Sequence, residues 1–287
     1  MKNQHLKNIL ELNIAVMLIS TSGVFGRSIS LAPGLTIWWR CFLAAIILGI
    51  YCWNRKYSFK IENRKNFFNL ILSGGFLGAH WVTYFYSLQL SSVAIGMLSL
   101  FTYPVITSLL EPLFFKIKLN KIQLLLGLVV LVGIYFLTPE MNISNNYTKG
   151  VIWGVISAVF YSLRNILTKK NLHHFNGTKV MFYQLVIILV LLWPVFFKLD
   201  FTPNTSDWVK LIGLALITTA IGHSLFVGVF KKFTIGTVSI MSSIGPIYGI
   251  LFGLLFLNEI PAVKTIIGGI LILTTVAIEG FNSIKTK

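Results

Sequence analysis

Long apolar runs separated by short polar breaks dominate the sequence. A helix needs about 20 mainly apolar residues to cross the hydrocarbon core of a bilayer. Apolar runs that can meet this requirement lie at Leu12–Ser30, Leu35–Trp53, Phe67–Leu88, Val93–Phe115, Ile122–Thr138, Gly150–Leu167, Val180–Phe197, Trp208–Phe230, Ile235–Leu257 and Ala262–Phe281. Several breaks hold turn-forming pairs such as Pro33-Gly34 and Asn176-Gly177. The pattern predicts an all-α membrane protein with ten transmembrane helices.

The composition agrees with a surface that faces lipid. Of the 287 residues, 55% are hydrophobic and only 11% are charged, and the mean hydropathy is +0.80. Soluble domains carry roughly 25% charged residues, so charge this sparse does not cover a water-facing surface. The net charge of +16 comes from basic residues that lie between the apolar runs and form no single stripe. The sequence therefore indicates a lipid bilayer, and no nucleic acid, as partner.

Lysine and arginine are distributed unequally between the two sides of the predicted membrane. If the N-terminus is cytoplasmic, the inner segments hold seventeen of these residues and the outer segments hold four. The remaining three, Arg27, Arg40 and Arg164, lie inside predicted helices. Membrane proteins concentrate positive charge in their cytoplasmic segments. The distribution therefore predicts that both termini are cytoplasmic.

The two halves of the chain resemble each other. A shift of 142 positions places Pro104 on Pro246, and a shift of 137 positions places Arg27 on Arg164. Each half contains five predicted helices, an odd number, so the second half must insert upside down relative to the first. Inverted repeats are typical of secondary transporters, which bind substrate between the halves near the membrane midplane.

The repeat predicts the domain organisation. We expect a first five-helix repeat at residues 1–140, an outer linker at 141–148 and a second five-helix repeat at 149–287. Under this arrangement, Arg27 lies toward the outer side of the first helix and Arg164 toward the inner side of the sixth.

One stretch of the second half points to a known family. The segment Ser243–Glu259, with the sequence SIGPIYGILFGLLFLNE, is followed by Gly268-Gly269 and resembles the EamA family of the drug/metabolite transporter superfamily. Proteins of this family have two inverted five-helix repeats, a Pro in helices 4 and 9, a Glu that closes helix 9 and a Gly in helix 10. These positions correspond here to Pro104, Pro246, Glu259 and Gly269. The resemblance implies export or exchange of small solutes such as amino acids.

The sequence departs from the family pattern at one position. Ile117 occupies the first-half position that corresponds to Glu259, so the usual acidic residue is missing there. This departure puts in doubt any role that needs both glutamates.

We expect a multi-pass secondary transporter of small molecules that works by alternating access around a central cavity. A passive channel and a membrane-embedded enzyme are the alternatives. No G-x-x-x-x-G-K-[ST] run exists, so transport would draw on a proton gradient or on solute exchange. The chain has no long tail or soluble domain, which fits a bacterial inner-membrane protein, and a homodimer is left open.

Neither catalysis nor a bound metal or other cofactor is expected. A membrane enzyme would need a cluster of catalytic side chains on one face, and four of the eight acidic residues lie in predicted loops. No cysteine spacing typical of metal sites occurs, and the pair His173-His174 lies in a basic loop without further ligands nearby.

Three arginines inside predicted helices are candidates for substrate binding. Arginine near the centre of a membrane helix costs free energy, so it usually faces a cavity or a partner. Arg27, Arg40 and Arg164 around a watery cavity would suit a carboxylate or phosphate through paired hydrogen bonds. The alternative is that each side chain extends to the membrane surface from near its helix end.

Polar and aromatic side chains on shared helix faces complete the predicted substrate site. Residues spaced by four and seven positions lie on one face of a helix. Two such sets occur, and the candidates are Ser157, Tyr161 and Arg164 on one helix, His80 and Tyr84 with the adjacent Trp81 on another, and Ser20 and Tyr103. The alternative for these residues is ordinary helix packing, with hydrogen bonds between neighbouring helices.

Proton coupling and hinge motion also have candidates. Glu111, His80 and His223 lie in membrane segments and could carry a coupled proton. Pro104 and Pro246 lie inside predicted helices, where a missing backbone hydrogen bond favours a kink that could act as a hinge. The alternative for Glu111 is an ion pair with Lys116, Lys118 or a buried arginine. The histidines could instead bond to a neighbouring helix, and the prolines could serve helix packing. Small residues spaced by four, such as Gly150 and Gly154, predict close contacts between helices.

Overall fold

The computed structural model describes residues 2–61, 63–115, 121–137, 142–171, 176–197, 203–229, 231–233, 238 and 241–285. All regular structure in these ranges is helical. The helices are α1 (Lys2–Ser20), α2 (Ser22–Ser28), α3 (Pro33–Asn54), α4 (Arg64–Leu90), α5 (Val93–Leu100), α6 (Tyr103–Phe115), α7 (Lys121–Phe136), α8 (Asn146–Asn171), α9 (Gly177–Leu192), η1 (Trp193–Phe197), α10 (Thr205–Gly213), η2 (Leu214–His223), α11 (Ser224–Val229), α13 (Gly245–Leu257) and α14 (Val263–Lys285). The all-helical prediction is confirmed for the described residues. Ile117, Glu140 and His173-His174 lie outside them.

Within the described residues, six helical segments are long and apolar enough to cross a membrane. They are Leu6–Ser28, Pro33–Asn54, Val93–Phe114, Asn146–Thr168, Gly177–Phe197 and Thr205–Val229. Three shorter apolar helices, Leu124–Phe136, Gly245–Leu257 and Val263–Ile278, accompany them. Large apolar side chains such as Leu128, Leu255 and Ile270 are exposed, which is typical of a surface that faces lipid tails. The protein is therefore a multi-pass membrane protein.

The helix α4 is long but less apolar, because it carries polar residues that the fold buries. Ser73, His80, Thr83 and Ser87 all lie on its buried faces. In the sequence these residues interrupt the run Phe67–Leu88, yet the helix is continuous. A helix with polar groups inside a membrane protein marks the interior of the bundle and not its lipid surface.

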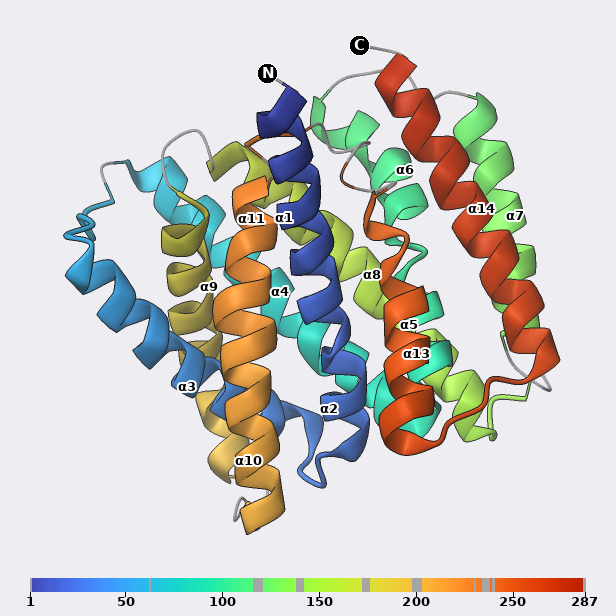
Figure 1. Cartoon of the computed structure of the whole chain (residues 1–287), viewed down its shortest axis with the longest axis horizontal. Coiled ribbons are helices and arrows are strands. Elements are labelled where there is room, and N and C mark those ends of the chain that lie inside the picture. The colour runs from blue at the N-terminus through green and yellow to red at the C-terminus, as the bar shows by residue number, and fades with distance from the viewer. Residues whose placement is uncertain are drawn as a thin grey trace.

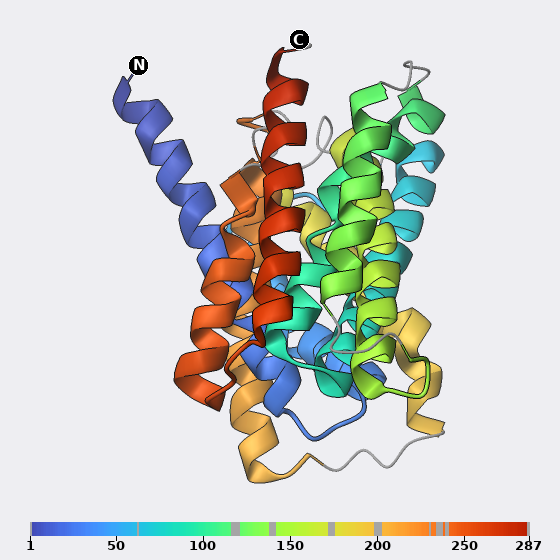
Figure 2. The same cartoon turned by 90° about the vertical axis from the view of Figure 1, so that its right-hand side faces the viewer.

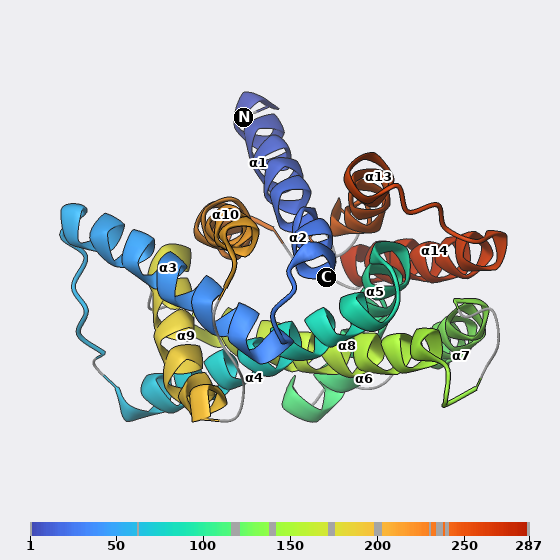
Figure 3. The ribbon, with the colours of Figure 1, turned by 90° about the horizontal axis from the view of Figure 1, so that it is seen from below.

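The helices run side by side in an elongated bundle, with both termini at the same end (Figure 1). The pair α4 and α8 lies at the centre, as the view from below shows (Figure 3). The pair α3 and α9 packs on one side of this centre, and the pair α7 and α14 packs on the other. The helices α1, α11 and α13 lie along one face of the central pair, where α1 leans outward toward its N-terminus (Figure 2).

Small residues allow the central helices to approach closely, as their spacing predicts. A Cβ atom placed on Gly154 of α8 would lie 2.4 Å from the Cβ of Ser99, and one on Gly150 would lie 2.6 Å from the Cβ of Ser91. On α13, a Cβ on Gly249 would lie 2.6 Å from the methyl carbon of Met97 on α5. Glycine is therefore required at these contacts for steric reasons.

The prolines that the sequence places inside helices lie instead at helix starts. The run Val93–Phe115 is broken at Phe101 and Thr102, and Pro104 occupies the second position of α6. Pro246 occupies the second position of α13, directly after a turn. Proline is favoured in the first turn because the backbone N–H that it lacks would have no partner within the helix. Each proline thus begins a new helix after a short break, and the predicted role of these positions as hinges stays a prediction.

A second irregularity lies in the run Trp208–Phe230. Its central part, η2, is a ten-residue π-helix from Leu214 to His223. The hydroxyl of Thr219 donates a hydrogen bond to the carbonyl oxygen of Leu214, five residues earlier. Wide helical turns of this kind are rare and occur most often at functional sites. This one brings Thr219 and His223 to the interior of the bundle.

Candidate functional site

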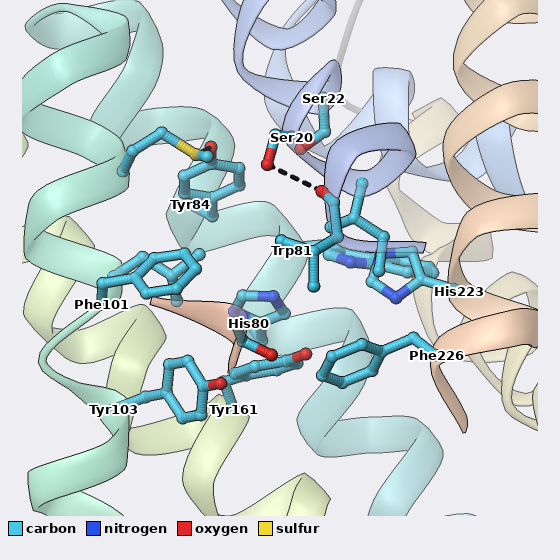
Figure 4. A pocket seen from close by; sticks show the side chains of 15 residues that line it. Ser20, Ser22, His80, Trp81, Tyr84, Phe101, Tyr103, Tyr161, His223 and Phe226 are labelled. Carbon is cyan, nitrogen blue, oxygen red and sulfur yellow. Dashed lines mark hydrogen bonds between the residues drawn. The ribbon is translucent and has the colours of Figure 1, made fainter. Parts of the chain in front are cut away.

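A cavity that is partly open to the outside lies between the central pair of helices and the helices that cover one face of it. Its walls come from both halves of the chain (Figure 4). The lining residues are Val16, Ile19, Ser20, Ser22, His80, Trp81, Tyr84, Met97, Leu100, Phe101, Tyr103, Tyr161, His223, Phe226 and Ser242. Seven of the residues expected at a substrate or coupling site therefore line one space, namely Ser20, His80, Trp81, Tyr84, Tyr103, Tyr161 and His223.

His80 forms the floor of this site, where Ser157 of α8 holds it from behind. The Nδ1 of His80 lies 2.7 Å from the Oγ of Ser157 and 3.3 Å from its carbonyl oxygen. The Ser157 hydroxyl in turn donates to the carbonyl oxygen of His80 at 2.9 Å. A carbonyl oxygen accepts only, so Nδ1 carries the proton in this arrangement. In neutral His80, Nε2 is then an acceptor.

Aromatic rings surround His80. Its ring centroid lies 4.4 Å from that of Tyr161 and 6.1 Å from that of Tyr84. Tyr161 in turn makes an edge-to-face contact with Tyr103 at 4.8 Å. Aromatic pairs at these separations are mutually attractive and hold one another in place. The rings form a rigid wall with polar tips, which is typical of small-molecule sites.

The opposite wall is held by α1, α2 and α5. The Ser20 hydroxyl lies 2.8 Å from the carbonyl oxygen of Val16 and 3.0 Å from that of Gly245, so it links α1 to the start of α13. The Tyr84 hydroxyl donates to the sulfur of Met97 at 2.6 Å. These contacts come from residues far apart in the sequence, so the wall exists only in the folded bundle.

Arg40 lies behind the cavity wall and not on its surface. It is fully buried on α3, and its guanidinium carbon lies 3.9 Å from the ring centroid of Trp81, which lines the cavity. Its Nε donates to the Oγ1 of Thr219 at 2.6 Å. Its Nη1 and Nη2 make no hydrogen bond to any residue that the structure describes. His223 lies on the cavity side, with its ring 5.2 Å from Trp81.

Arg164 is also fully buried behind the wall, three residues after Tyr161 on α8. Its Nη2 donates to the Oε1 of Gln184 at 2.8 Å, and its Nη1 donates to the Oδ1 of Asn165 at 3.1 Å. The Nε2 of Gln184 donates in turn to Ser73 at 3.0 Å and Thr168 at 2.9 Å. The position of Arg164 is thus determined by neutral hydrogen-bond partners.

Sequence reasoning missed Gln184 and Thr219, the partners of the two buried arginines. Each is a polar residue inside an apolar run, which is the one signal that could have found them. The pairing itself, between helices far apart in the chain, leaves no trace in a single sequence.

Arg27 lies away from the cavity, at the end of the bundle opposite the termini. Its Nε donates to the Oε1 of Glu259 at 2.9 Å, and its Nη1 donates to the carbonyl oxygen of Gln89 at 3.0 Å. The other carboxylate oxygen of Glu259 accepts from the backbone N–H of Val93, at the start of α5, at 2.7 Å. We call this set, Arg27, Glu259 and Val93, the Glu259 contact. Glu259 thus forms a salt bridge and caps the start of α5.

The other candidates are spread over the fold. Glu111 is half-buried on α6 and does not line the cavity. Pro104 and Pro246 do not line it either; Pro104 follows Tyr103, which does, and Pro246 follows Gly245, whose carbonyl oxygen accepts from Ser20. Among the described residues, no three His, Cys, Asp or Glu side chains lie close enough together to hold a metal ion.

Three comparisons bear on what this site belongs to. The profile of the EamA-like transporter family matches the chain twice, at residues 7–138 and 148–279. The uncharacterized transporter YxxF of Bacillus subtilis is 24% identical over 94% of this chain and 88% of its own. The pseudopaline exporter CntI of Pseudomonas aeruginosa is 24% identical over 71% of this chain and 72% of its own. A solved crystal structure of another protein, 16% identical, has the same fold with a TM-score of 0.69 over 98% of this chain and 99% of its own.

Proposed function

Because the chain belongs to the EamA-like transporter family, we propose that it is a secondary transporter that exports or exchanges small metabolites. The observation that carries this proposal is the cavity, whose walls come from α1, α2, α4, α5 and α6 of the first half and from α8, η2 and α11 of the second. A site shared between two halves can change its access when the halves move relative to each other. One relative is named as an exporter of pseudopaline, and this name supports export as the direction of transport.

The proposal includes a specific topology. Ten transmembrane helices form two inverted five-helix repeats, at residues 1–140 and 149–287, joined by an outer linker at 141–148. Both termini are cytoplasmic, and the membrane is a bacterial inner membrane. The position of both termini at one end of the bundle supports this topology, as do the two family matches and the excess of basic residues in the inner segments (Figure 1).

Alternating access requires contacts that form at one end of the cavity and break at the other. At the proposed outer end, the Glu259 contact joins α2, α5 and the end of α13. At the proposed inner end, Lys232 donates to Glu11 at 2.5 Å and Tyr248 donates to Asn13 at 2.7 Å. Both ends are joined by polar contacts that water can replace, and the helix starts at Pro104 and Pro246 offer points of bending between them.

Candidate substrates are amino acids and related small metabolites, and His80 and His223 are the groups that could carry a coupled proton. His80 lies within the cavity and has one ring nitrogen that Ser157 does not engage. A histidine can exchange a proton near neutral pH when water reaches it. Glu111 is the third candidate for coupling, at a position outside the cavity.

The test is counterflow in liposomes. The purified protein is reconstituted in vesicles preloaded with a metabolite mixture, and the uptake of labelled amino acids and small organic anions is measured. We expect saturable uptake that Tyr161→Ala abolishes, because Tyr161 forms the wall next to His80. The matched control is Leu128→Ala on the exposed face of α7, which should retain uptake.

Two outcomes would contradict the proposal. Rapid uptake without saturation would indicate a passive channel. No uptake of any solute across a broad panel, by protein that gives a sharp thermal unfolding transition, would argue against transport of small metabolites altogether.

A further inference from the structure

Two positive charges lie unbalanced behind the cavity wall. Arg40 and Arg164 are both fully buried, and neither forms an ion pair with an acidic side chain that the structure describes. The carboxylates of three other residues are engaged elsewhere: Glu259 is paired with Arg27, Glu11 with Lys232, and Asp207 accepts hydrogen bonds from Ser30. Charge buried in this way costs free energy unless an opposite charge compensates it.

The two arginines are placed so that their charge acts on the cavity. Arg40 stacks on the far face of Trp81, whose ring is part of the lining. Arg164 follows Tyr161, another lining residue, by three positions along α8. The ring of Trp81 thus lies between the charge of Arg40 and the cavity, and Arg164 lies about one helical turn from a lining residue. In a medium of low dielectric constant, a charge acts strongly over such a distance.

Arg40 also retains hydrogen-bonding capacity that the described residues do not use. Its Nη1 and Nη2 are buried and have no hydrogen-bond partner among these residues. A guanidinium group with two free nitrogens on one edge matches a carboxylate or phosphate group. Rotation of the Trp81 side chain would open a direct path from these nitrogens to the cavity.

The lining itself fits an apolar body and not a cation. Rings from Trp81, Phe101, Tyr103, Tyr161 and Phe226 contribute to the wall, and none of the lining residues that the structure describes is acidic. A cationic solute would therefore meet two positive charges and no counter-charge. A neutral solute would leave both arginines uncompensated.

We infer that the cavity binds an organic anion, a small compound with one anionic head group and an aromatic or branched aliphatic body. The head group compensates Arg40 and Arg164, and the body packs against the aromatic rings. This inference rests on the proposed transport function and specifies its substrate class.

The test compares compounds that share a body and differ in charge. One series is indole-3-acetate, indole-3-acetamide and tryptamine, and a second is 4-methylpentanoate with its amide and amine; phenyl phosphate tests whether a phosphate serves as well as a carboxylate. Each is measured as a competitor of counterflow in liposomes and by the thermal unfolding temperature of the purified protein. We expect the acids to act at concentrations at least about tenfold below those of the amides, because Coulomb's law at an effective dielectric constant of about 20 gives a factor of about ten for unit charges about 12 Å apart and more at shorter distances. The amines should be the weakest.

Variants identify the charges that are responsible. Arg40→Gln and Arg164→Gln should each reduce the preference for acid over amide severalfold, whereas Arg40→Lys, which retains the charge, should keep most of it. Lys149→Gln, which removes an exposed positive charge, is the matched control and should leave the preference unchanged. If one arginine variant fails to fold, the other variant and the wild-type series still decide the question.

The possible outcomes separate the two proposals. If the wild type transports solutes but favours amides or amines, or shows no preference for charge, the organic-anion assignment is wrong and the transport function stands. If chloride alone raises the thermal unfolding temperature, and neither series shows a preference for the acid, the organic-anion assignment is also wrong. If the folded protein moves no solute in the counterflow panel, the transport function itself fails.

Discussion

Ser157 on α8 and His80 on α4 exchange hydrogen bonds between the two halves of the chain. The Nδ1 of His80 lies 2.7 Å from the Ser157 hydroxyl oxygen, and that hydroxyl donates to the carbonyl oxygen of His80 at 2.9 Å. Both residues are buried, and the contact sets the tautomer and the orientation of the one imidazole ring that lies between Tyr84 and Tyr161. The chemistry of the cavity floor therefore depends on a contact between the halves.

Replacing Ser157 tests this contact. In Ser157→Ala, His80 loses its closest partner, and a buried polar group without a good partner costs about 1–3 kcal/mol of stability. We expect a lower thermal unfolding temperature and weaker uptake in the counterflow assay. Ser144→Ala, at an exposed position in the loop before α8, is the control and should change neither. Wild-type stability and uptake in Ser157→Ala would mean that the contact is dispensable.

Replacing Thr219 tests how Arg40 is held. The Thr219 hydroxyl accepts the hydrogen bond from Arg40 Nε at 2.6 Å. In Thr219→Val this bond to a buried charge is lost, with an expected cost of about 1.5–3 kcal/mol. Thr219→Ser retains the hydroxyl and should keep most of the stability. Thermal unfolding of the purified variants measures both, and a larger loss in Thr219→Ser than in Thr219→Val would show that the methyl group matters and not the hydrogen bond.

The close contact between α8 and α5 makes a steric prediction. A Cβ on Gly154 would lie 2.4 Å from the Cβ of Ser99, so Gly154→Ala forces the helices apart, at a cost of about 1–3 kcal/mol. Gly228 on α11 is the matched control, because a Cβ there meets no atom within 4 Å. Gly228→Ala should be neutral or stabilising, since alanine favours the helix. Unfolding temperatures that rank the two variants the other way would contradict this packing.

The Glu259 contact makes a prediction about conformational change. Glu259→Gln weakens the bond to Arg27 and the cap on the N–H of Val93, so the proposed outer end should open more often. A cysteine introduced as Ser22→Cys, on the cavity wall, should then react severalfold faster with a membrane-impermeant thiol reagent applied from outside. The native cysteines Cys41 and Cys52 are buried, so the unmodified protein provides the background rate. An unchanged labelling rate would assign the Glu259 contact a purely structural role.

Much of this protein follows from the sequence by itself. A bilayer requires long apolar helices, and that requirement is visible in composition and in run length, so the helical class, the membrane and the family could all be predicted. The faces of single helices were also predictable, because the helical period relates residues that are near in sequence. Ser157 and Tyr161 on α8, and His80 and Tyr84 on α4, do face the same interior.

Only the tertiary structure decided which of these side chains meet. Arg27, Arg40 and Arg164 look alike in the sequence, yet one forms a surface ion pair with Glu259 and the others are buried behind a wall of rings. Their partners Gln184 and Thr219 lie on other helices, and the π-helical turns that direct Thr219 inward have no signature in a single sequence. Contacts between helices depend on how the helices cross and rotate against one another, which the sum of many side-chain contacts determines.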